Sequence, residues 1–349
     1  MGQKTGIEWT ESTWNPIRGC SRVSEGCRNC YAETVANRFK GPGEPYEGLI
    51  AKGGQWNGEV KLIQHKLQEP LRWKKPRRIF VNSMSDLFHE NVPDSFIDQV
   101  FAVMAMTTRH TYQILTKRPE RMRDYITNLT EAAKDEQFAV DNELLGLPDR
   151  ISNYAIDHIN KGADNCGPLW PLHNVWLGVS VEDQPTADER IPQLLETPAA
   201  VRWISAEPLL GPIILDDFLF RGDHSLRETD PLAAAMLAEA VADGHGWIRP
   251  AIDWVVVGGE SGPGARPMHP YWARYLRDRC QAAEVPFLFK QWGEFAPSPD
   301  GGLPDDLPES AGYYFEDPHP PGKTWRFGKK RAGRMLDGEV WDQYPELAQ

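Results

Sequence analysis

The feature that most constrains this chain is a repeated unit: a short apolar run, then polar residues, then a segment with helical periodicity. The apolar runs occupy residues 78–81, 112–116, 175–180, 201–205, 252–257 and 286–289, and the helical segments occupy residues 31–40, 94–106, 119–129, 188–196 and 271–283. Short runs that are apolar throughout are typical of parallel strands buried on both faces. Their alternation with helices predicts a parallel β/α fold.

A further strand is predicted in residues 7–16, IEWTESTWNP, although apolar and polar residues alternate poorly there. Seven candidate strands are enough for a full or partial parallel (β/α) barrel, and a flat doubly wound sheet is the alternative. We expect a single barrel domain over residues 1–293, with insertions at about 130–172 and 216–250. Residues 294–349, rich in Pro, Gly and Asp, predict a C-terminal extension packed on the barrel.

Composition narrows the class of protein. The net charge of -12 disfavours indiscriminate nucleic-acid binding but is compatible with a local basic groove. The 13 Trp and 13 Phe argue against disorder. The sequence contains no run of 18 apolar residues, so it predicts no membrane-spanning helix. The polar start, MGQKTGIEWTEST, lacks the apolar centre of a signal peptide, so we expect a cytoplasmic location.

Three of the five cysteines fall within eleven residues, between the first predicted strand and the first predicted helix. Cys20, Cys27 and Cys30 are spaced Cys-x6-Cys-x2-Cys, whereas Cys166 and Cys280 are isolated in the sequence. Clustered cysteines in a cytosolic chain indicate a metal more often than a disulfide.

The spacing alone leaves three interpretations open. A structural zinc site requires a distant fourth ligand, for which the candidates are His65, His89, Cys166 and Cys280. An electron-transfer iron–sulfur cluster also takes four thiolates, whereas a cluster held by three leaves one iron open to a substrate or cosubstrate. The third interpretation is that the cysteines bind no metal.

Polar residues follow the predicted strands, at the face of a parallel barrel where active sites lie. They are Asn82, Ser83, Asp86, Thr116, Lys117, Ser180, Glu182, Ser205, Glu207, Glu260, Ser261, Lys290 and Gln291. Glu207, Glu260 and Lys290 are the strongest catalytic candidates, because each places a charge after an apolar strand. The alternative for each residue is that it caps a helix or satisfies a backbone group. Gly258 and Gly259 would let the backbone pass close to a cosubstrate.

Two basic segments raise the question of a nucleic-acid partner. Residues 72–78, RWKKPRR, include Trp73, and residues 329–334 carry four basic side chains. Lysine and arginine contact phosphates, and an aromatic ring can stack on a base. The alternative is a solvated surface with ordinary ion pairs.

Several stretches carry a resemblance to known proteins. They are IEWTESTWNP with the cysteines, RRIFVNSMSDLFHE, YQILTKRPERM, NVWLGVSVEDQ, RWISAEPLLGP, IDWVVVGGESGPGARPMHP and PFLFKQWGE. On these stretches the chain resembles a phage- and prophage-associated three-cysteine-motif family of uncertain function. The cysteine loop itself resembles that of the radical S-adenosylmethionine superfamily, which implies a barrel of the radical-SAM type.

The superfamily resemblance implies a chemistry. Cys20, Cys27 and Cys30 would ligate a [4Fe-4S] cluster, whose fourth iron would be chelated by S-adenosyl-L-methionine. One electron, from a flavodoxin-like or ferredoxin-like donor, would cleave the sulfonium and release a 5′-deoxyadenosyl radical that abstracts hydrogen from a substrate. The barrel would shield that radical from water.

The chain differs from the commonest superfamily pattern in two ways. The first cysteine gap is six residues rather than three, and Asn29 replaces the aromatic residue that usually precedes the third cysteine. Gly-Gly-Glu, usual after the second strand, occurs here after a later one. By position, the resemblance assigns Asn82, Ser83, Asp86, Ser180, Gly258 and Gly259 to the cosubstrate, and Glu207, Glu260 and Lys290 to an unidentified substrate.

The leading hypothesis is therefore a radical S-adenosylmethionine enzyme, with a nucleic acid or a nucleotide as a candidate substrate. A zinc-stabilised nucleic-acid-binding protein without catalysis is the alternative. The third hypothesis is a metal-free barrel hydrolase that uses the carboxylates.

Overall fold

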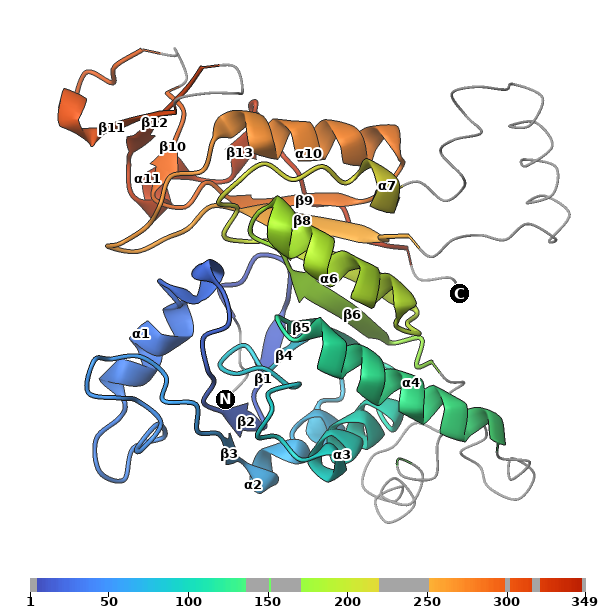
Figure 1. The fold of residues 1–349 in the computed structure, drawn as a ribbon. Helices are drawn as coiled ribbons and strands as arrows, with labels where there is room; N and C mark the ends of the chain where they lie inside the picture. The colour runs from blue at the N-terminus through green and yellow to red at the C-terminus, as the bar shows by residue number, and fades with distance from the viewer. Residues whose placement is uncertain are drawn as a thin grey trace, which may run out of the picture.

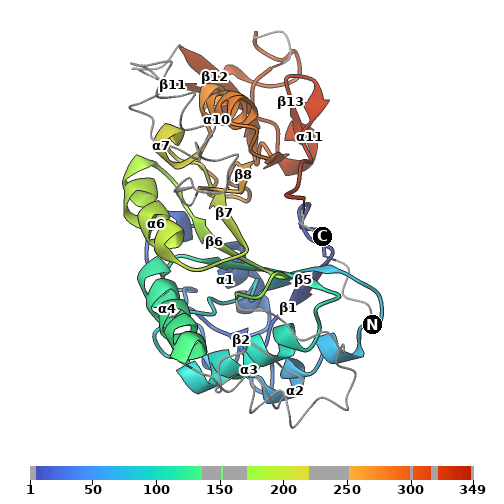
Figure 2. The same ribbon diagram turned by 90° about the vertical axis from the view of Figure 1, so that its right-hand side faces the viewer.

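The computed structural model describes residues 5–135, 151, 171–219, 251–298, 302–315 and 321–346. Seven parallel strands form one curled sheet in the order β1-β4-β5-β6-β7-β8-β9 (Figures 1 and 2). Their bounds are β1 (Ser12–Trp14), β4 (Arg78–Val81), β5 (Thr111–Thr116), β6 (Val175–Ser180), β7 (Val201–Ala206), β8 (Trp254–Gly258) and β9 (Phe287–Gln291). The strands follow chain order without the reversal that defines a doubly wound sheet. The predicted parallel β/α barrel is confirmed, as a partial barrel.

The larger helices cover the convex face of the sheet (Figure 2). They are α3 (Asp94–Ala105), α4 (Pro119–Asp135), α6 (Gln184–Glu196) and α10 (Pro270–Ala282), and α1 (Tyr31–Arg38) follows the cysteines. Helix α6 begins four residues earlier than the sequence predicted. Asp183 accepts a hydrogen bond from Thr186 N at 3.0 Å and donates its own N–H to Thr186 Oγ1 at 3.1 Å. This capping box satisfies the first turn and extends the helix toward β6.

The two faces of the sheet have different packing. Strand side chains on the convex face, such as Val179 and Val257, join the helices in the main core. The concave face carries a second apolar cluster with no helix residue in it, comprising Trp9, Phe80, Trp176, Val201, Trp203, Trp254, Val256 and Leu288. A Cβ on Gly178 would lie 2.5 Å from the Trp203 indole, so a glycine there leaves room for the ring. Tryptophan rings therefore fill much of the barrel interior on the concave face of the sheet.

The C-terminal segment covers the open edge of the sheet at β9. Phe289 N donates to Trp341 O at 2.9 Å, and Gln343 N donates to Phe287 O at 3.2 Å. Further along, the centroid of the Tyr344 ring lies 5.3 Å from the centroid of the Trp254 ring. Because an uncovered strand edge is prone to pair with another chain, this segment protects the sheet.

Several short elements lie outside the parallel sheet and were not predicted. They are the sheet β10 (Phe295–Ala296), β12 (Gly322–Arg326) and β11 (Gly312–Phe315), the hairpin β13 (Met335–Leu336) and β14 (Glu339–Val340), the pair β2 (Ile17–Arg18) and β3 (Lys61–Leu62), and the short helices α2 (Gln64–Leu67), α7 (Asp216–Leu219) and α11 (Lys329–Ala332). The predicted domain bounds remain predictions, since much of the two insertions and Cys166 lie outside the described residues.

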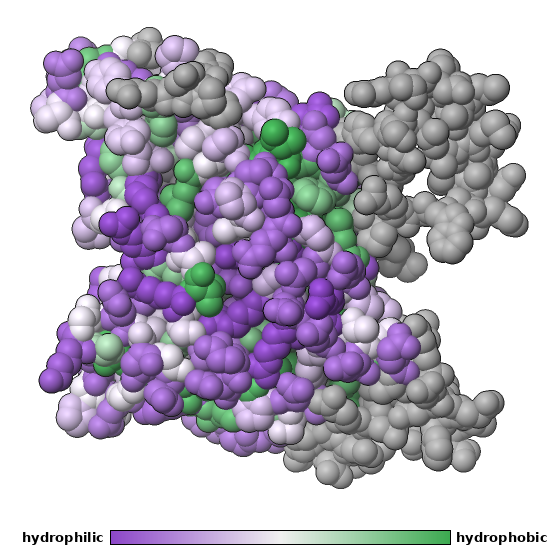
Figure 3. Space-filling view, in the orientation of Figure 1, coloured by the Kyte–Doolittle hydropathy of each residue, from purple (hydrophilic) through white to green (hydrophobic). Residues whose placement is uncertain are grey.

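The surface over α6 is mainly hydrophilic (Figure 3). A helix that packs one apolar face on a sheet turns its polar face to water. Within the described ranges, no helix is both long and apolar enough to cross a membrane.

Candidate functional site

The cysteine loop (residues 19–30) crosses the carboxyl ends of the parallel strands. It leaves β2 at Gly19, which bridges to Ser85 just beyond β4, and it ends where Cys30 precedes α1. A short 3-10 turn, Glu25–Cys27, includes the second cysteine. The loop therefore lies at the face of the barrel predicted to carry the active site.

A cavity of about 350 Å³ lies beneath this loop. Its apolar walls include Trp9, Phe80 and Leu115, and its polar walls include Asn29, Cys30, Lys117, Ser180, Ser205, Glu207, Gly259, Glu260, Ser261, Lys290, Gln291 and Lys329. Five of the residues given a cosubstrate or substrate role from the sequence, together with one cysteine, thus share one space: Ser180, Glu207, Gly259, Glu260, Lys290 and Cys30. Their assigned roles remain predictions.

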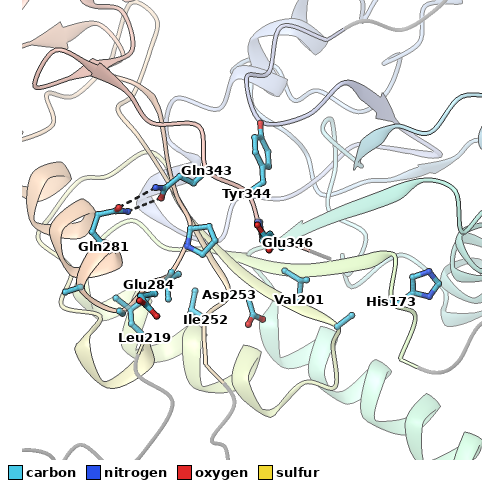
Figure 4. A pocket seen from close by; sticks show the side chains of 16 residues that line it. His173, Val201, Leu219, Ile252, Asp253, Gln281, Glu284, Gln343, Tyr344 and Glu346 are labelled. Atoms are coloured by element: carbon cyan, nitrogen blue, oxygen red, sulfur yellow. Dashed lines mark hydrogen bonds between the residues drawn. The ribbon is translucent and has the colours of Figure 1, made fainter. Parts of the chain in front are cut away.

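A larger cavity, of about 1170 Å³, lies at the opposite ends of the strands (Figure 4). It is lined by residues that begin or precede strands, such as Val201, Asp253 and Pro286. Gln281 and Gln343 bond to each other on its wall. None of the site residues predicted from the sequence lines it. We therefore take the smaller cavity under the cysteine loop as the candidate site.

Glu207 and Lys290 form an ion pair on the cavity wall. Lys290 Nζ lies 2.7 Å from Glu207 Oε1 and 2.9 Å from Oε2, and Gln291 Nε2 donates to Oε1 at 3.3 Å. A Cβ on Gly258 would lie 3.2 Å from the Glu207 carboxyl carbon, so this glycine leaves space for the carboxylate. The pair presents a base and an acid side by side to anything in the cavity.

Glu260 is more fully engaged than the sequence indicated. Its carboxylate accepts from Arg266 Nε at 2.9 Å, from Arg266 Nη2 at 2.7 Å and from Asn29 Nδ2 at 3.0 Å. Burial alone would raise the pKa of Glu260, but these hydrogen bonds outweigh burial and hold the pKa below its ordinary value. The contacts are those of a carboxylate that fixes the cysteine loop.

The residues after β4 lie around the loop rather than on the cavity wall. Asp86 is buried and accepts from Thr116 Oγ1 at 2.8 Å and from Arg118 Nη1 at 3.0 Å. Ser83 O accepts from the Tyr31 hydroxyl. Asn82 is buried at φ 59°, and neither atom of its carboxamide has a hydrogen-bond partner in the described part of the chain. Buried polar atoms without partners are uncommon, so Asn82 is available to a bound group.

The three cysteines of the loop supply the thiols that a cluster held by three thiolates requires. All three are half-buried free thiols, and Arg118 Nη1 lies 3.9 Å from Cys20 Sγ. Burial and, to a smaller extent, the Asp86 carboxylate raise the pKa of Cys20 to about 12, and burial also raises the pKa of Cys30. Because thiolates bind metals, loading this site must displace protons.

A zinc site is not formed by the described side chains as they stand. Across the described ranges, no three Cys, His, Asp or Glu side chains converge as a single ion requires. Of the candidate fourth ligands, Cys280 is buried in the core, and both ring nitrogens of His89 have partners, Ser21 and Asn91.

The two basic segments have different environments. Residues 72–78 lead into β4 at the end of the sheet away from the cysteine loop. The Arg77 guanidinium carbon lies 4.9 Å from the centroid of the Trp73 ring. The Trp73 ring is therefore partly covered. Lys329, in the second segment, lines the candidate cavity. Sequence reasoning placed Lys329 only within a basic segment, and it did not single out Arg118 or Arg266, whose contacts with the cysteine loop are remote in the chain.

The fold and site define a partial parallel β/α barrel with a three-cysteine loop over a polar cavity. The chain belongs to the family described as Protein of unknown function (DUF5131), whose model matches residues 4–345. No curated protein matches it. Two solved structures that resemble it are a cysteine-to-serine mutant of spore photoproduct lyase and spore photoproduct lyase complexed with dinucleoside spore photoproduct. Each is 11% identical, with a TM-score of 0.35, over 93% of this chain and 71% of the other.

Proposed function

We propose that this protein is a radical S-adenosylmethionine enzyme, with Cys20, Cys27 and Cys30 as the ligands of a [4Fe-4S] cluster. The observation that carries the proposal is the shared cavity: a loop with three free thiols lies over charged strand ends at the carboxyl face of a parallel half-barrel. Three thiolates would leave one iron of such a cluster open, and the cavity that Cys30 lines would offer room for a cosubstrate. When bound, a reduced cluster supplies the electron that cleaves S-adenosyl-L-methionine to a carbon radical.

The chain's own residues would bind and enclose the cosubstrate. Its methionyl end would lie toward Asn82, Ser83 and Asp86, where the Asn82 carboxamide has no partner among the described residues. Ser180, Gly258 and Gly259, at the ends of β6 and β8, would contact its adenosyl end. Trp9 and Phe80, the members of the tryptophan cluster that line the cavity, would help to exclude water and stray hydrogen donors from it.

Glu207 and Lys290 would orient the substrate and exchange a proton with it. Both are partly exposed to the cavity, and each is the other's closest charged partner. A substrate hydroxyl or amine entering between them can donate to the carboxylate and accept from the ammonium. Glu260, whose oxygens are taken by Arg266 and Asn29, would hold the loop instead of reacting.

An anionic substrate, such as a nucleotide or a nucleic acid, is compatible with the charges around the cavity. Lys117 pairs with Glu182, Lys290 with Glu207, and Arg266 with Glu260. Lys329 also lines the cavity, and it adds a positive charge beyond these neutral pairs. A flavodoxin-like or ferredoxin-like protein would supply the electron.

Anaerobic reconstitution with iron and sulfide tests the proposal. We expect brown absorbance that bleaches with dithionite, and 5′-deoxyadenosine once S-adenosyl-L-methionine is added. Cys27→Ala should abolish both, whereas Cys280→Ala, which removes a buried thiol from the core, should leave both unchanged. Uptake of zinc in place of a coloured cluster would reject the proposal and favour the zinc-stabilised alternative.

A further inference from the structure

The gap of six residues between the first two cysteines carries most of the contacts that fix the cysteine loop. Residues 21–26 reach side chains that follow three different strands, β5, β6 and β8. We propose that these contacts hold the loop in its thiol-presenting shape before any metal binds, with Glu182 and Gly26 as the central positioning residues. The relevance of this shape to cluster binding rests on the function proposed above.

The first contact lies beside Cys20, at the start of the gap. Arg118, which follows β5, donates from Nη2 to Ser21 Oγ at 2.6 Å and to Ser21 O at 3.3 Å. The guanidinium is itself fixed by Asp86 at 3.0 Å and by Glu90 at 2.9 Å. A planar group held from two sides cannot swing away without breaking charged hydrogen bonds.

The second contact lies at the middle of the gap and centres on Glu182, two residues after β6. Ser24 Oγ donates to Glu182 Oε1 at 2.9 Å. The Glu182 side chain is 1% exposed and also accepts from Lys117 and from Arg190 Nη1 at 3.1 Å. Gly26 packs directly on this carboxylate, because a Cβ there would lie 2.2 Å from Oε1. Two cations hold Glu182 in place, so a larger residue at position 26 must move the loop.

The third contact lies near the end of the gap. Arg266, which follows β8, donates from Nη2 to Glu25 O at 2.9 Å. Glu260 holds the same guanidinium at 2.7 Å and also accepts from Asn29, next to the third cysteine, at 3.0 Å. The loop backbone is thus tied at its start, middle and end.

These ties explain why the gap is longer than three residues. A three-residue gap has no room for separate attachments to three strand ends, whereas six residues supply Ser21, Ser24, Glu25 and Gly26. Because strands are rigid supports, the barrel itself orders the loop and lowers the entropy lost when a cluster binds. Gly26 adjoins Cys27, so a displacement of Gly26 moves the second ligand most.

Thiol alkylation of the metal-free protein tests this directly. Iodoacetamide labelling, followed by mass mapping of each cysteine, compares wild type with Gly26→Ala and Glu182→Gln. We expect Cys27 to react about tenfold faster in both variants, because each disturbs the Glu182 carboxylate as a whole and not only its bond to Ser24. Gly53→Ala, where a Cβ meets nothing within 4 Å, and Glu196→Gln, exposed on α6, should match wild type.

Two further measurements keep the test decisive. Ser24→Ala removes one bond to Glu182 without introducing bulk, and it should give an intermediate labelling rate even if Gly26→Ala fails to fold. Iron bound after reconstitution should fall in the order wild type, Ser24→Ala, Gly26→Ala. Labelling rates equal to wild type in Ser24→Ala and Glu182→Gln would overturn the proposal. Labelling requires no metal, so a wild type that forms no cluster would contradict the proposed function while leaving this result readable.

Discussion

Lys290 Nζ lies 2.7 Å from Glu207 Oε1, although β8 separates the strands that carry the two residues. The curvature of the sheet brings the ends of β7 and β9 together over the cavity. Both side chains are mostly buried, with 15% of Lys290 and 17% of Glu207 exposed. Each charge therefore needs the opposite charge of its partner to offset the loss of hydration.

Removing one member of this pair should therefore cost more than removing both. We expect Lys290→Met alone to lower the free energy of unfolding by about 1–3 kcal/mol, because it leaves a carboxylate without its cation. Glu207→Gln combined with Lys290→Met should recover part of that loss. Urea unfolding of the two single variants and the double variant measures the coupling, and strictly additive losses would show that the pair is not coupled.

Gly178 should tolerate no side chain. A Cβ added at this position would lie 2.5 Å from the indole of Trp203, which belongs to the apolar cluster on the concave face of the sheet. Gly178→Ala is expected to lower the free energy of unfolding by about 1–3 kcal/mol through overpacking. Gly302→Ala, where a Cβ meets nothing within 4 Å, is the matched control. A melting temperature for Gly178→Ala equal to that of the control would contradict the close packing.

Acid should weaken the fold partly through Glu182. Burial alone would raise its pKa, but Lys117 and Arg190 outweigh burial and hold the pKa below the ordinary value of 4.5. A carboxylate with a lowered folded pKa stabilises the fold above pH 4.5, and this contribution is lost as the pH falls through the folded pKa. Wild type should thus lose unfolding free energy below pH 4.5 more steeply than Glu182→Gln. Equal slopes for the two proteins would show that Glu182 is not responsible.

Lys329 should contribute to binding an anionic ligand. Lys329→Gln is expected to weaken binding of a mononucleotide about fivefold to tenfold, the loss typical for one charged contact. Lys330, its neighbour, does not line the candidate cavity, so Lys330→Gln is the control. Tryptophan fluorescence titration at two salt concentrations measures both. Equal affinity for the two variants would place the anion elsewhere.

The sequence predicted the barrel well because its strands are defined locally. Runs such as Arg78–Val81 and Val175–Ser180 are mainly apolar, and the observed strands have those bounds. The first strand is shorter than predicted, Ser12–Trp14, because Trp9 turns into the barrel interior before it. The placement of Glu207 and Lys290 at one cavity also followed from the alternation of strands and helices.

The contacts that hold the cysteine loop could not be predicted in the same way. Arg118 lies 98 positions from Cys20, and Arg266 lies 241 positions from Glu25. No local pattern links such pairs, since they are brought together only by the closing of the sheet. The short antiparallel elements after residue 294 were missed for a different reason, because segments such as Gly322–Arg326 lack the apolar run that marks the parallel strands.

Electron paramagnetic resonance of the reconstituted, dithionite-reduced protein tests the central claim most directly. A cluster with one open iron on Cys20, Cys27 and Cys30 should give a reduced-cluster signal whose g values change when S-adenosyl-L-methionine is added. The signal should be absent in Cys27→Ala and unchanged in Cys280→Ala. A signal that does not respond to S-adenosyl-L-methionine, or that persists in Cys27→Ala, would contradict the account.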